Sequence, residues 1–318
     1  MKFSILKEAR KISDKFEKQS LKKHLLSSGS DDSGETGRNI DVMSKIKRKA
    51  VTEFKGKKRK IPEKKQTTYY IKKYKVSKPY PKEVNGVLEY ATYKIVKYYG
   101  TINPDIKIPK AIHLSFEEDD KQFTLASSVN YQNKSKANSG LRAMIYRQIA
   151  NKNAFFFSLI GYTDTHAGNI VATDESNYYL IDFDYAFHPF GDKVLRLWAP
   201  QIQVKQVKHA LLSSYALYKQ INIQKVRNII TDAFKKADKL LDEGVDKLEK
   251  KEYEDLKVKL SKLEEMMVNN LYYNKKLIEE FAKYYDFDNE LKTFNPNEPD
   301  YFDIKSTDGK NLPTSSTS

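Results

Sequence analysis

The fold of this chain is decided by residues 160–187, which read IGYTDTHAGNIVATDESNYYLIDFDYAF. The segment contains Asp164 and Asn169 in a first polar stretch and Asp182 in a second. Turn-forming residues at 174–177 separate two β-rich runs, so we expect a short hairpin that returns the chain beside the first stretch. The pattern therefore predicts that three oxygen-bearing side chains lie close together.

Carboxylate and amide side chains in this order suit phosphoryl transfer. That reaction needs a carboxylate near the attacking hydroxyl and oxygen ligands that hold divalent ions against the phosphates. The chain has no cysteine, which excludes disulfides, thiolate metal sites and a cysteine nucleophile. A lone Asp or Asn in a turn is more often a turn former or a helix cap. The joint spacing of the three residues, rather than any one of them, therefore favours a catalytic site.

The motif DTHAGN at 164–169, followed by IDFD at 181–184, resembles the catalytic and metal-binding loops of the kinase-like superfamily. This superfamily includes protein kinases, aminoglycoside and choline phosphotransferases, and phosphatidylinositol kinases. Asn169 follows Asp164 by five positions and Asp182 follows it by eighteen, as the superfamily pattern requires. The resemblance implies an α+β, bilobal protein-kinase-like fold with a small β-rich N-lobe and a mainly helical C-lobe. It also implies an enzyme that transfers the terminal phosphate of ATP to an alcohol group.

The same resemblance implies a role for each residue of the motif. Asp164 would be the catalytic base, and Asn169 and Asp182 would hold a metal ion, Mg²⁺ or Mn²⁺, against ATP. Asp184 would help to hold a second metal ion. His166 would either support the loop or take part in catalysis.

A lysine and a glutamate upstream are expected to bind the nucleotide. In the superfamily a strand lysine contacts the ATP phosphates and pairs with a glutamate on the next helix. Lys72 follows Ile71 in a β-rich run, as the motif lysine does, and Glu89 lies in the following helical pattern. Lys73, on the opposite face of the strand, and Glu83 are the alternatives.

Several parts of the site depart from the superfamily pattern. The resemblance implies that backbone groups near Ser127 and Val129 bind adenine. The loop that would cover the phosphates differs, because no glycine-rich loop precedes Lys72 at the usual distance. Thr163 replaces the usual residue before the catalytic aspartate, and Asp184 stands where protein kinases have the glycine after Asp-Phe. These departures argue against an ordinary regulated eukaryotic protein kinase.

The formal charge of +15 lies almost entirely in one segment. Residues 44–78 contain fifteen Lys or Arg and only two Glu. Such a segment attracts polyanions, so we expect an anionic membrane or an inositol polyphosphate to bind there. The alternative is a solvated basic loop; nucleic acid is not expected, because no recognition helix or stacking motif accompanies the charge. The predicted polyanion-binding residues are Lys55, Lys57, Lys58, Arg59 and Lys60.

The chain has 318 residues, 39% of them hydrophobic, enough for a large core. We expect a helical appendage and flexible linker over 1–43, the N-lobe over 44–130, the helical C-lobe over 131–290 and a disordered tail over 291–318. Within the first part, helical spacing covers 1–26, and a Ser, Gly and Asp-rich linker covers 27–37. Strands are predicted at 106–114 and 122–129 and in a three-stranded antiparallel arrangement over 50–75; helices are predicted at 83–99, 141–159, 204–221, 223–249 and 252–285.

Three functions remain open. The first is an atypical Ser/Thr protein kinase, the second a phosphoinositide or other small-alcohol kinase acting at a membrane, and the third a nucleotide-binding pseudokinase scaffold. No apolar stretch approaches the length of a membrane helix and no signal peptide is evident, so we expect a soluble protein. The chain is similar to effector kinases that intracellular bacteria inject into host cells, which implies action in host cytosol or at host membranes.

Overall fold

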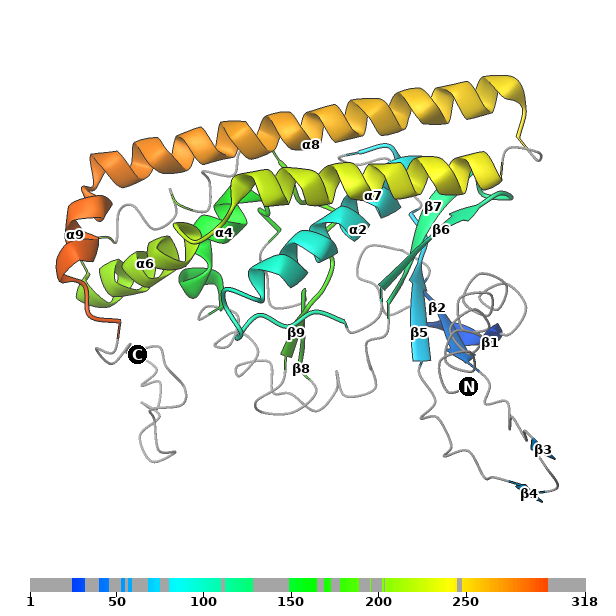
Figure 1. Ribbon diagram of the computed structural model, residues 1–318, viewed down its shortest axis with the longest axis horizontal. Coiled ribbons are helices and arrows are strands. Elements are labelled where there is room, and N and C mark those ends of the chain that lie inside the picture. Colours follow the sequence, from blue (N-terminus) through cyan, green and yellow to red (C-terminus); the bar gives the residue numbers. More distant parts are fainter. Residues whose placement is uncertain are drawn as a thin grey trace, which may run out of the picture.

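In a computed structural model, most of the described strands lie in the first half of the protein and most of the described helices in the second. The structure describes residues 25–31, 40–45, 53–54, 57–58, 68–74, 80–109, 112–127, 149–164, 169–172, 178–188, 195, 202, 204–244 and 248–296. A sheet of five strands lies against long helices (Figure 1). The predicted α+β class is confirmed.

The five-stranded sheet is antiparallel and starts earlier in the chain than the sequence predicted. Its strands follow the order β1 (Leu25–Asp31), β2 (Ile40–Lys45), β5 (Thr68–Lys72), β7 (Gln122–Ser127) and β6 (Ile112–Glu117). The linker expected at 27–37 is wrong for residues 27–31, which pair with β2, and the sheet begins before the expected N-lobe boundary at 44. The expected strand at 106–114 begins only at Ile112.

The three-stranded arrangement expected over 50–75 is also wrong. The two-residue strands β3 (Glu53–Phe54) and β4 (Lys57–Lys58) pair with each other as a separate hairpin. Strand β5 instead pairs with β2 on one side and β7 on the other. Residues 1–24, the first part of the expected helical appendage, and 297–318, most of the expected tail, lie outside the described residues.

Helix α2 (Lys82–Tyr99) confirms the helix predicted at 83–99 and packs against β7. Most of its side chains are buried, because β7 covers one side and later helices cover another. Gly86 allows the close approach to the sheet: a Cβ atom there would lie 2.4 Å from the carbonyl oxygen of Phe123. The helix ends at Gly100, as predicted.

The second half contains α4 (Ala154–Leu159), β8 (Ile170–Ala172), β9 (Tyr178–Leu180), α6 (Lys205–Tyr218), α7 (Ile223–Glu243), α8 (Lys250–Tyr284) and α9 (Phe287–Thr293). The β8–β9 hairpin and the three long helices confirm the predictions, whereas α9 was not predicted. Of the helix expected at 141–159, residues 149–159 are described and a turn at Asn153 interrupts them. None of the described helices has the length and apolar composition needed to cross a bilayer.

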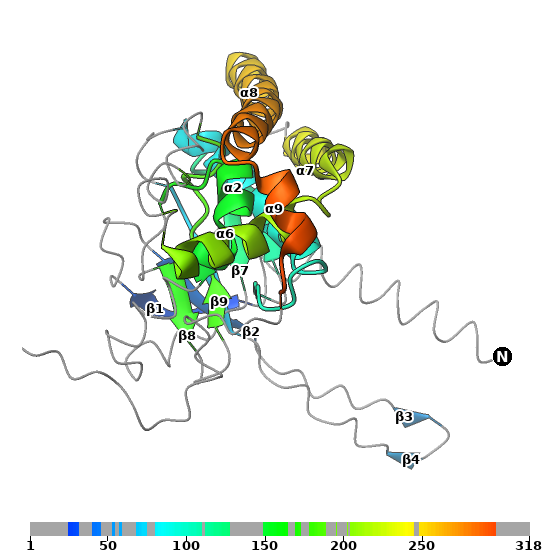
Figure 2. The same ribbon diagram turned by 90° about the vertical axis from the view of Figure 1, so that its left-hand side faces the viewer.

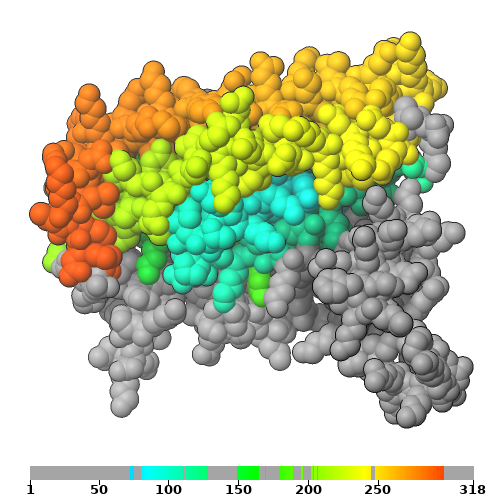
Figure 3. Space-filling model, viewed as in Figure 1, coloured from blue at the N-terminus to red at the C-terminus, as the bar shows by residue number. Residues whose placement is uncertain are grey.

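Helices α7 and α8 run alongside each other and both contact α2 (Figures 1 and 2). Figure 3 shows α7 lying between α8 and α2 on one face of the molecule. Lys259 of α8 forms an ion pair with Glu83 of α2 at 3.3 Å. Asn270 of α8 donates a hydrogen bond to the carbonyl oxygen of Phe187 at 2.7 Å. Helix α8 therefore contacts both α2 and the segment that follows Asp182.

Candidate functional site

Lys72, the last residue of β5, lies among three carboxylates. Its Nζ atom is 2.5 Å from Oδ1 of Asp182, 2.9 Å from Oε2 of Glu89 and 3.6 Å from Oδ2 of Asp184. The lysine side chain is 14% exposed, so these charges interact with little screening by water. The structure thus brings together four residues that the sequence singled out, from a strand, a helix and a loop.

Glu89 is held at both carboxylate oxygens, as a buried charge requires. Its side chain is 1% exposed. Oε1 accepts a hydrogen bond from the backbone N–H of Phe183 at 3.2 Å, and Oε2 accepts one from the Tyr74 hydroxyl at 2.5 Å in addition to its contact with Lys72. Glu89 therefore ties α2 to β5 and to the loop that carries Asp182.

The two alternatives considered for the nucleotide pair lie elsewhere. Lys73 points away from Lys72 along the strand and forms an ion pair with Asp120 at 2.8 Å. Glu83 forms its ion pair with Lys259. The geometry therefore favours Lys72 with Glu89.

Two tyrosine hydroxyls hold the backbone of Asp182. The N–H of Asp182 donates to the Tyr93 hydroxyl at 3.3 Å, and its carbonyl oxygen accepts from the Tyr162 hydroxyl at 3.2 Å. Asp182 has φ 64°, a left-handed conformation that is strained for a residue other than glycine and is often found at functional sites. The rings of Tyr93 and Tyr162 also flank Phe183, at centroid distances of 4.9 and 5.1 Å.

Sequence reasoning missed both tyrosines, although a signal was present. Tyr93 follows Glu89 by four residues, so both side chains lie on one face of α2. Tyr162 precedes Asp164 by two residues in the loop already singled out. Applying helix spacing to the predicted Glu89 would have drawn attention to Tyr93.

Asn169 connects the two polar stretches of the motif. It is buried, and its Nδ2 donates to the carbonyl oxygen of Asp164 at 2.8 Å and to the Tyr162 hydroxyl at 2.9 Å, with Oδ2 of Asp164 at 3.4 Å. Gly161 begins this loop with φ 55°, and a Cβ there would lie 2.3 Å from the carbonyl oxygen of His188. Only glycine fits the turn that places Asp164.

The site has an excess of buried negative charge. Burial raises the pKa of the Asp184 carboxyl to about 8, while Lys72 lowers it and Asp182 and Glu89 raise it. Burial is the main cause that raises the pKa of the Tyr74 hydroxyl well above its ordinary value, and the nearby Glu89 carboxylate raises it further. The phenol therefore stays protonated and can donate its hydrogen bond at any ordinary pH.

The chemistry of this donor set fits a hard divalent cation. Mg²⁺ prefers carboxylate and amide oxygens, which Asp182, Asp184 and Asn169 carry, and a cation would offset the repulsion between the two carboxylates. In the described part of the chain no group of three or more His, Asp or Glu side chains is arranged as a metal site. The predicted metal ligands Asn169, Asp182 and Asp184 differ from such a group because one of the three is an amide.

The remaining predicted residues are only partly described. Ser127 ends β7 as a buried residue, whereas Val129 lies outside the described residues. His166 is also outside them. Of the predicted polyanion-binding residues, Lys57 and Lys58 form β4, and Lys55, Arg59 and Lys60 lie outside the described residues.

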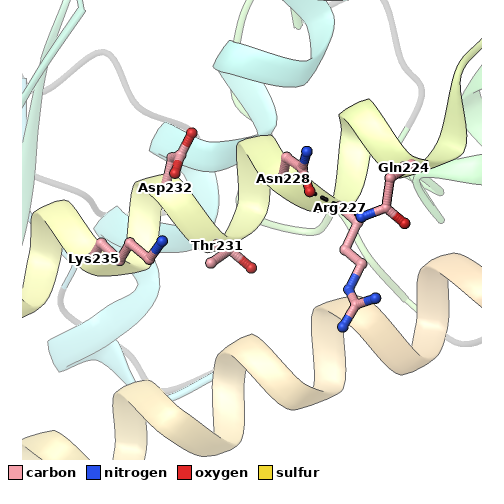
Figure 4. Close-up of a pocket in the computed structure, with 6 residues that line it drawn as sticks. All are labelled: Gln224, Arg227, Asn228, Thr231, Asp232 and Lys235. Atoms are coloured by element: carbon pink, nitrogen blue, oxygen red, sulfur yellow. Dashed lines mark hydrogen bonds between the residues drawn. The ribbon is translucent and has the colours of Figure 1, made fainter.

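A groove of about 510 Å³ lies along α7 (Figure 4), and none of the predicted site residues line it. All six lining side chains are polar and come from successive turns of this one helix: Gln224, Arg227, Asn228, Thr231, Asp232 and Lys235. This spacing is that of a solvated helix face. We assign it no role.

No family model matches the chain, and no curated protein matches it either. The geometry around Lys72 is therefore the main guide to function.

Proposed function

We propose that the protein is an ATP-dependent phosphotransferase with a bilobal, kinase-like arrangement. One observation carries the proposal: Lys72, Glu89 and Asp182 come from three separate elements and meet within 2.9 Å of the lysine ammonium. In the superfamily that the motif resembles, the equivalent groups bind ATP phosphates, orient the lysine and hold the metal ion. The five-stranded sheet with α2 would form the small lobe, and α4 with the following helices the larger one.

Each residue has a chemical role in this proposal. A substrate hydroxyl attacks the γ-phosphorus, a new P–O bond forms as the bond to the ADP oxygen breaks, and the hydroxyl proton passes to the Asp164 carboxylate. Lys72 binds phosphate oxygens, and Glu89 orients Lys72. Asn169, Asp182 and Asp184 would hold Mg²⁺ or Mn²⁺, which neutralises charge on the phosphates.

Nucleotide binding requires an exchange of partners in this site. The Oδ1 atom of Asp182 lies 2.5 Å from Nζ of Lys72. If Asp182 is to bind a cation, Lys72 must turn from that carboxylate to the phosphates. Hydrogen bonds with the Tyr93 and Tyr162 hydroxyls hold the Asp182 backbone, so this exchange needs only side-chain movement.

The substrate we put first is a serine or threonine hydroxyl on a protein. The second candidate is a phosphoinositide or small-alcohol kinase, favoured by the fifteen basic residues of 44–78, which would attract anionic lipid. The third is a pseudokinase scaffold, favoured by the missing glycine-rich loop.

The basic segment would also have a regulatory role in this proposal. An inositol polyphosphate bound there would act as a regulator, and charge reversal of Lys57, Lys58 and Arg59 should then lower turnover without unfolding the protein.

A radiolabelled ATP assay with a generic protein substrate and, separately, with phosphatidylinositol vesicles tests these candidates. Label in protein that disappears in Asp182→Ala supports the first function, and label only in lipid supports the second. Nucleotide binding without transfer supports the third function. A protein that neither binds nucleotide nor transfers phosphate would refute all three. Asp238→Ala is the matched control, because this exposed aspartate pairs with Lys257 on α8, remote from Lys72.

A further inference from the structure

Tyr74 lies beside the proposed nucleotide site and has no role assigned so far. It follows Lys72 by two residues, so in extended chain both side chains point to the same side. The tyrosine is 3% exposed. Its backbone N–H donates to Oε1 of Gln122 at 3.0 Å, which fixes the end of β5 against β7.

The Tyr74 hydroxyl and the Lys72 ammonium share one oxygen of Glu89. The hydroxyl donates to Oε2 at 2.5 Å and the ammonium lies 2.9 Å from the same atom. Nζ of Lys72 also lies 5.3 Å from the centre of the Tyr74 ring, within the range of a cation–π contact. Tyr74 therefore contacts both members of the pair.

The shared oxygen matters when a nucleotide binds. Lys72 then divides its charge between Glu89 and the phosphates, and its attraction for the Glu89 carboxylate weakens. A buried carboxylate needs other donors at that moment. The Tyr74 phenol supplies one at Oε2, and the Phe183 N–H supplies one at Oε1.

We propose that Tyr74 is a positioning residue for nucleotide binding: its hydroxyl holds Glu89 so that Glu89 keeps Lys72 directed at the phosphates. It acts through Glu89 and does not touch the nucleotide. This inference rests on the proposed function and deepens it. It also fits the missing glycine-rich loop, because without that loop the lysine carries more of the phosphate binding.

The test is the affinity of the full-length protein for a fluorescent ATP analogue with Mg²⁺, measured for wild type and Tyr74→Phe. The substitution keeps the buried ring and removes only the hydroxyl. We expect the Kd to rise about tenfold, because a hydrogen bond to a charged group is lost. In the transfer assay the KM for ATP should rise similarly while kcat stays within about twofold.

Tyr215→Phe is the matched control. Tyr215 is also 3% exposed and its hydroxyl donates to a carboxylate, Asp288, at 3.1 Å, but it lies in α6, remote from Lys72. Its loss should lower the melting temperature without changing the Kd. A purely structural role for Tyr74 would give this same result.

A second variant, Gln122→Met, removes the acceptor of the Tyr74 N–H. It should weaken nucleotide binding about threefold, since the Tyr74 hydroxyl remains but its residue is held less firmly. It decides the question if Tyr74→Phe does not fold.

The outcomes separate the two proposals. Wild-type protein that binds no nucleotide would overturn the proposed function, and this inference with it. If wild-type protein binds nucleotide and folded Tyr74→Phe has an unchanged Kd, the role of Tyr74 alone is overturned. If Tyr74→Phe is unfolded, an unchanged Kd in Gln122→Met has the same meaning.

Discussion

Replacing Gly86 with alanine tests how closely α2 must approach the sheet. A Cβ atom at this position would lie 2.4 Å from the carbonyl oxygen of Phe123 and 2.8 Å from its carbonyl carbon, whereas such contacts stay above 3.0 Å in proteins. The obstacle is strand backbone, which has no rotamer to change. Helix α2 would have to move away from β7 by at least about 0.6 Å, the difference between 2.4 and 3.0 Å.

Two opposing effects set the size of the change. Alanine favours a helix over glycine by about 1 kcal/mol. Overpacking against the sheet costs about 1–3 kcal/mol. Glu89 lies on the same helix, so the movement would lengthen its 2.9 Å contact with Lys72 to about 3.5 Å, and losing a hydrogen bond to a charged group costs about 1.5–3 kcal/mol more. We therefore expect the free energy of unfolding to fall by about 1.5–5 kcal/mol.

Urea unfolding followed by circular dichroism measures this free energy. Gly100→Ala is the matched control, because φ at Gly100 is −61° and a Cβ would lie 3.2 Å from the nearest atom, the carbonyl oxygen of Ile106. This variant should stay within about 1 kcal/mol of wild type. A Gly86→Ala protein as stable as wild type, or more so, would show that helix propensity alone acts and would refute the close approach.

Three further predictions concern single side chains. Lys72→Met should weaken binding of an ATP analogue at least about tenfold while Lys73→Met leaves it unchanged, and equal effects would contradict the assignment of the nucleotide lysine. Tyr162→Phe should lower kcat more than it raises the KM for ATP and should cost about 1 kcal/mol in urea unfolding, because the hydroxyl fixes the backbone of the proposed metal ligand; wild-type kcat would argue against this role. Hydrogen bonds from Lys257 and a nearby tyrosine lower the pKa of Asp242 from 3.8, so this carboxylate stabilises the fold above pH 4 and loses that effect as the pH falls further. The difference in unfolding free energy between wild type and Asp242→Asn should shrink between pH 5 and 3, and a constant difference would contradict the hydrogen-bonding pattern.

Local patterns predicted the elements around the site well. The β8–β9 hairpin was expected from the turn residues between two β-rich runs, and α2 from its apolar spacing and the glycine that ends it. The motif, in which the lysine follows an isoleucine, selected Lys72 over Lys73, and the ion pairs of the two lysines agree with that choice. These features depend on neighbours in sequence, which a pattern records.

Features that depend on distant contacts were not predictable in this way. Strands β1 and β2 come from a stretch rich in Ser, Gly and Asp that shows little alternation. They form because β2 pairs with the edge of β5 and β1 pairs in turn with β2. The assumption that β5 pairs with its sequence neighbour β4 failed, because β2 and β7 take both of its edges. Tyr74 bonds Glu89 of α2, and Tyr93 and Tyr162 bond the Asp182 backbone, so all three acquire their roles only when segments far apart in the chain meet. Their spacing from the predicted site residues could have drawn attention to Tyr93 and Tyr162, but no single-sequence pattern gives the distant hydrogen-bond partner of a tyrosine hydroxyl.

The contacts of α8 bear on how the proposed enzyme could be switched. This one helix bonds both to the start of α2, through Lys259, and to the backbone just after the proposed metal-binding loop, through Asn270. An outward swing of α2, a common way to turn such enzymes off, would have to break this connection. Amide protons of α2 should accordingly exchange with solvent as slowly as those of α8. If the proposed function holds, control is more effectively exerted on access of substrate than on the arrangement of the proposed catalytic groups.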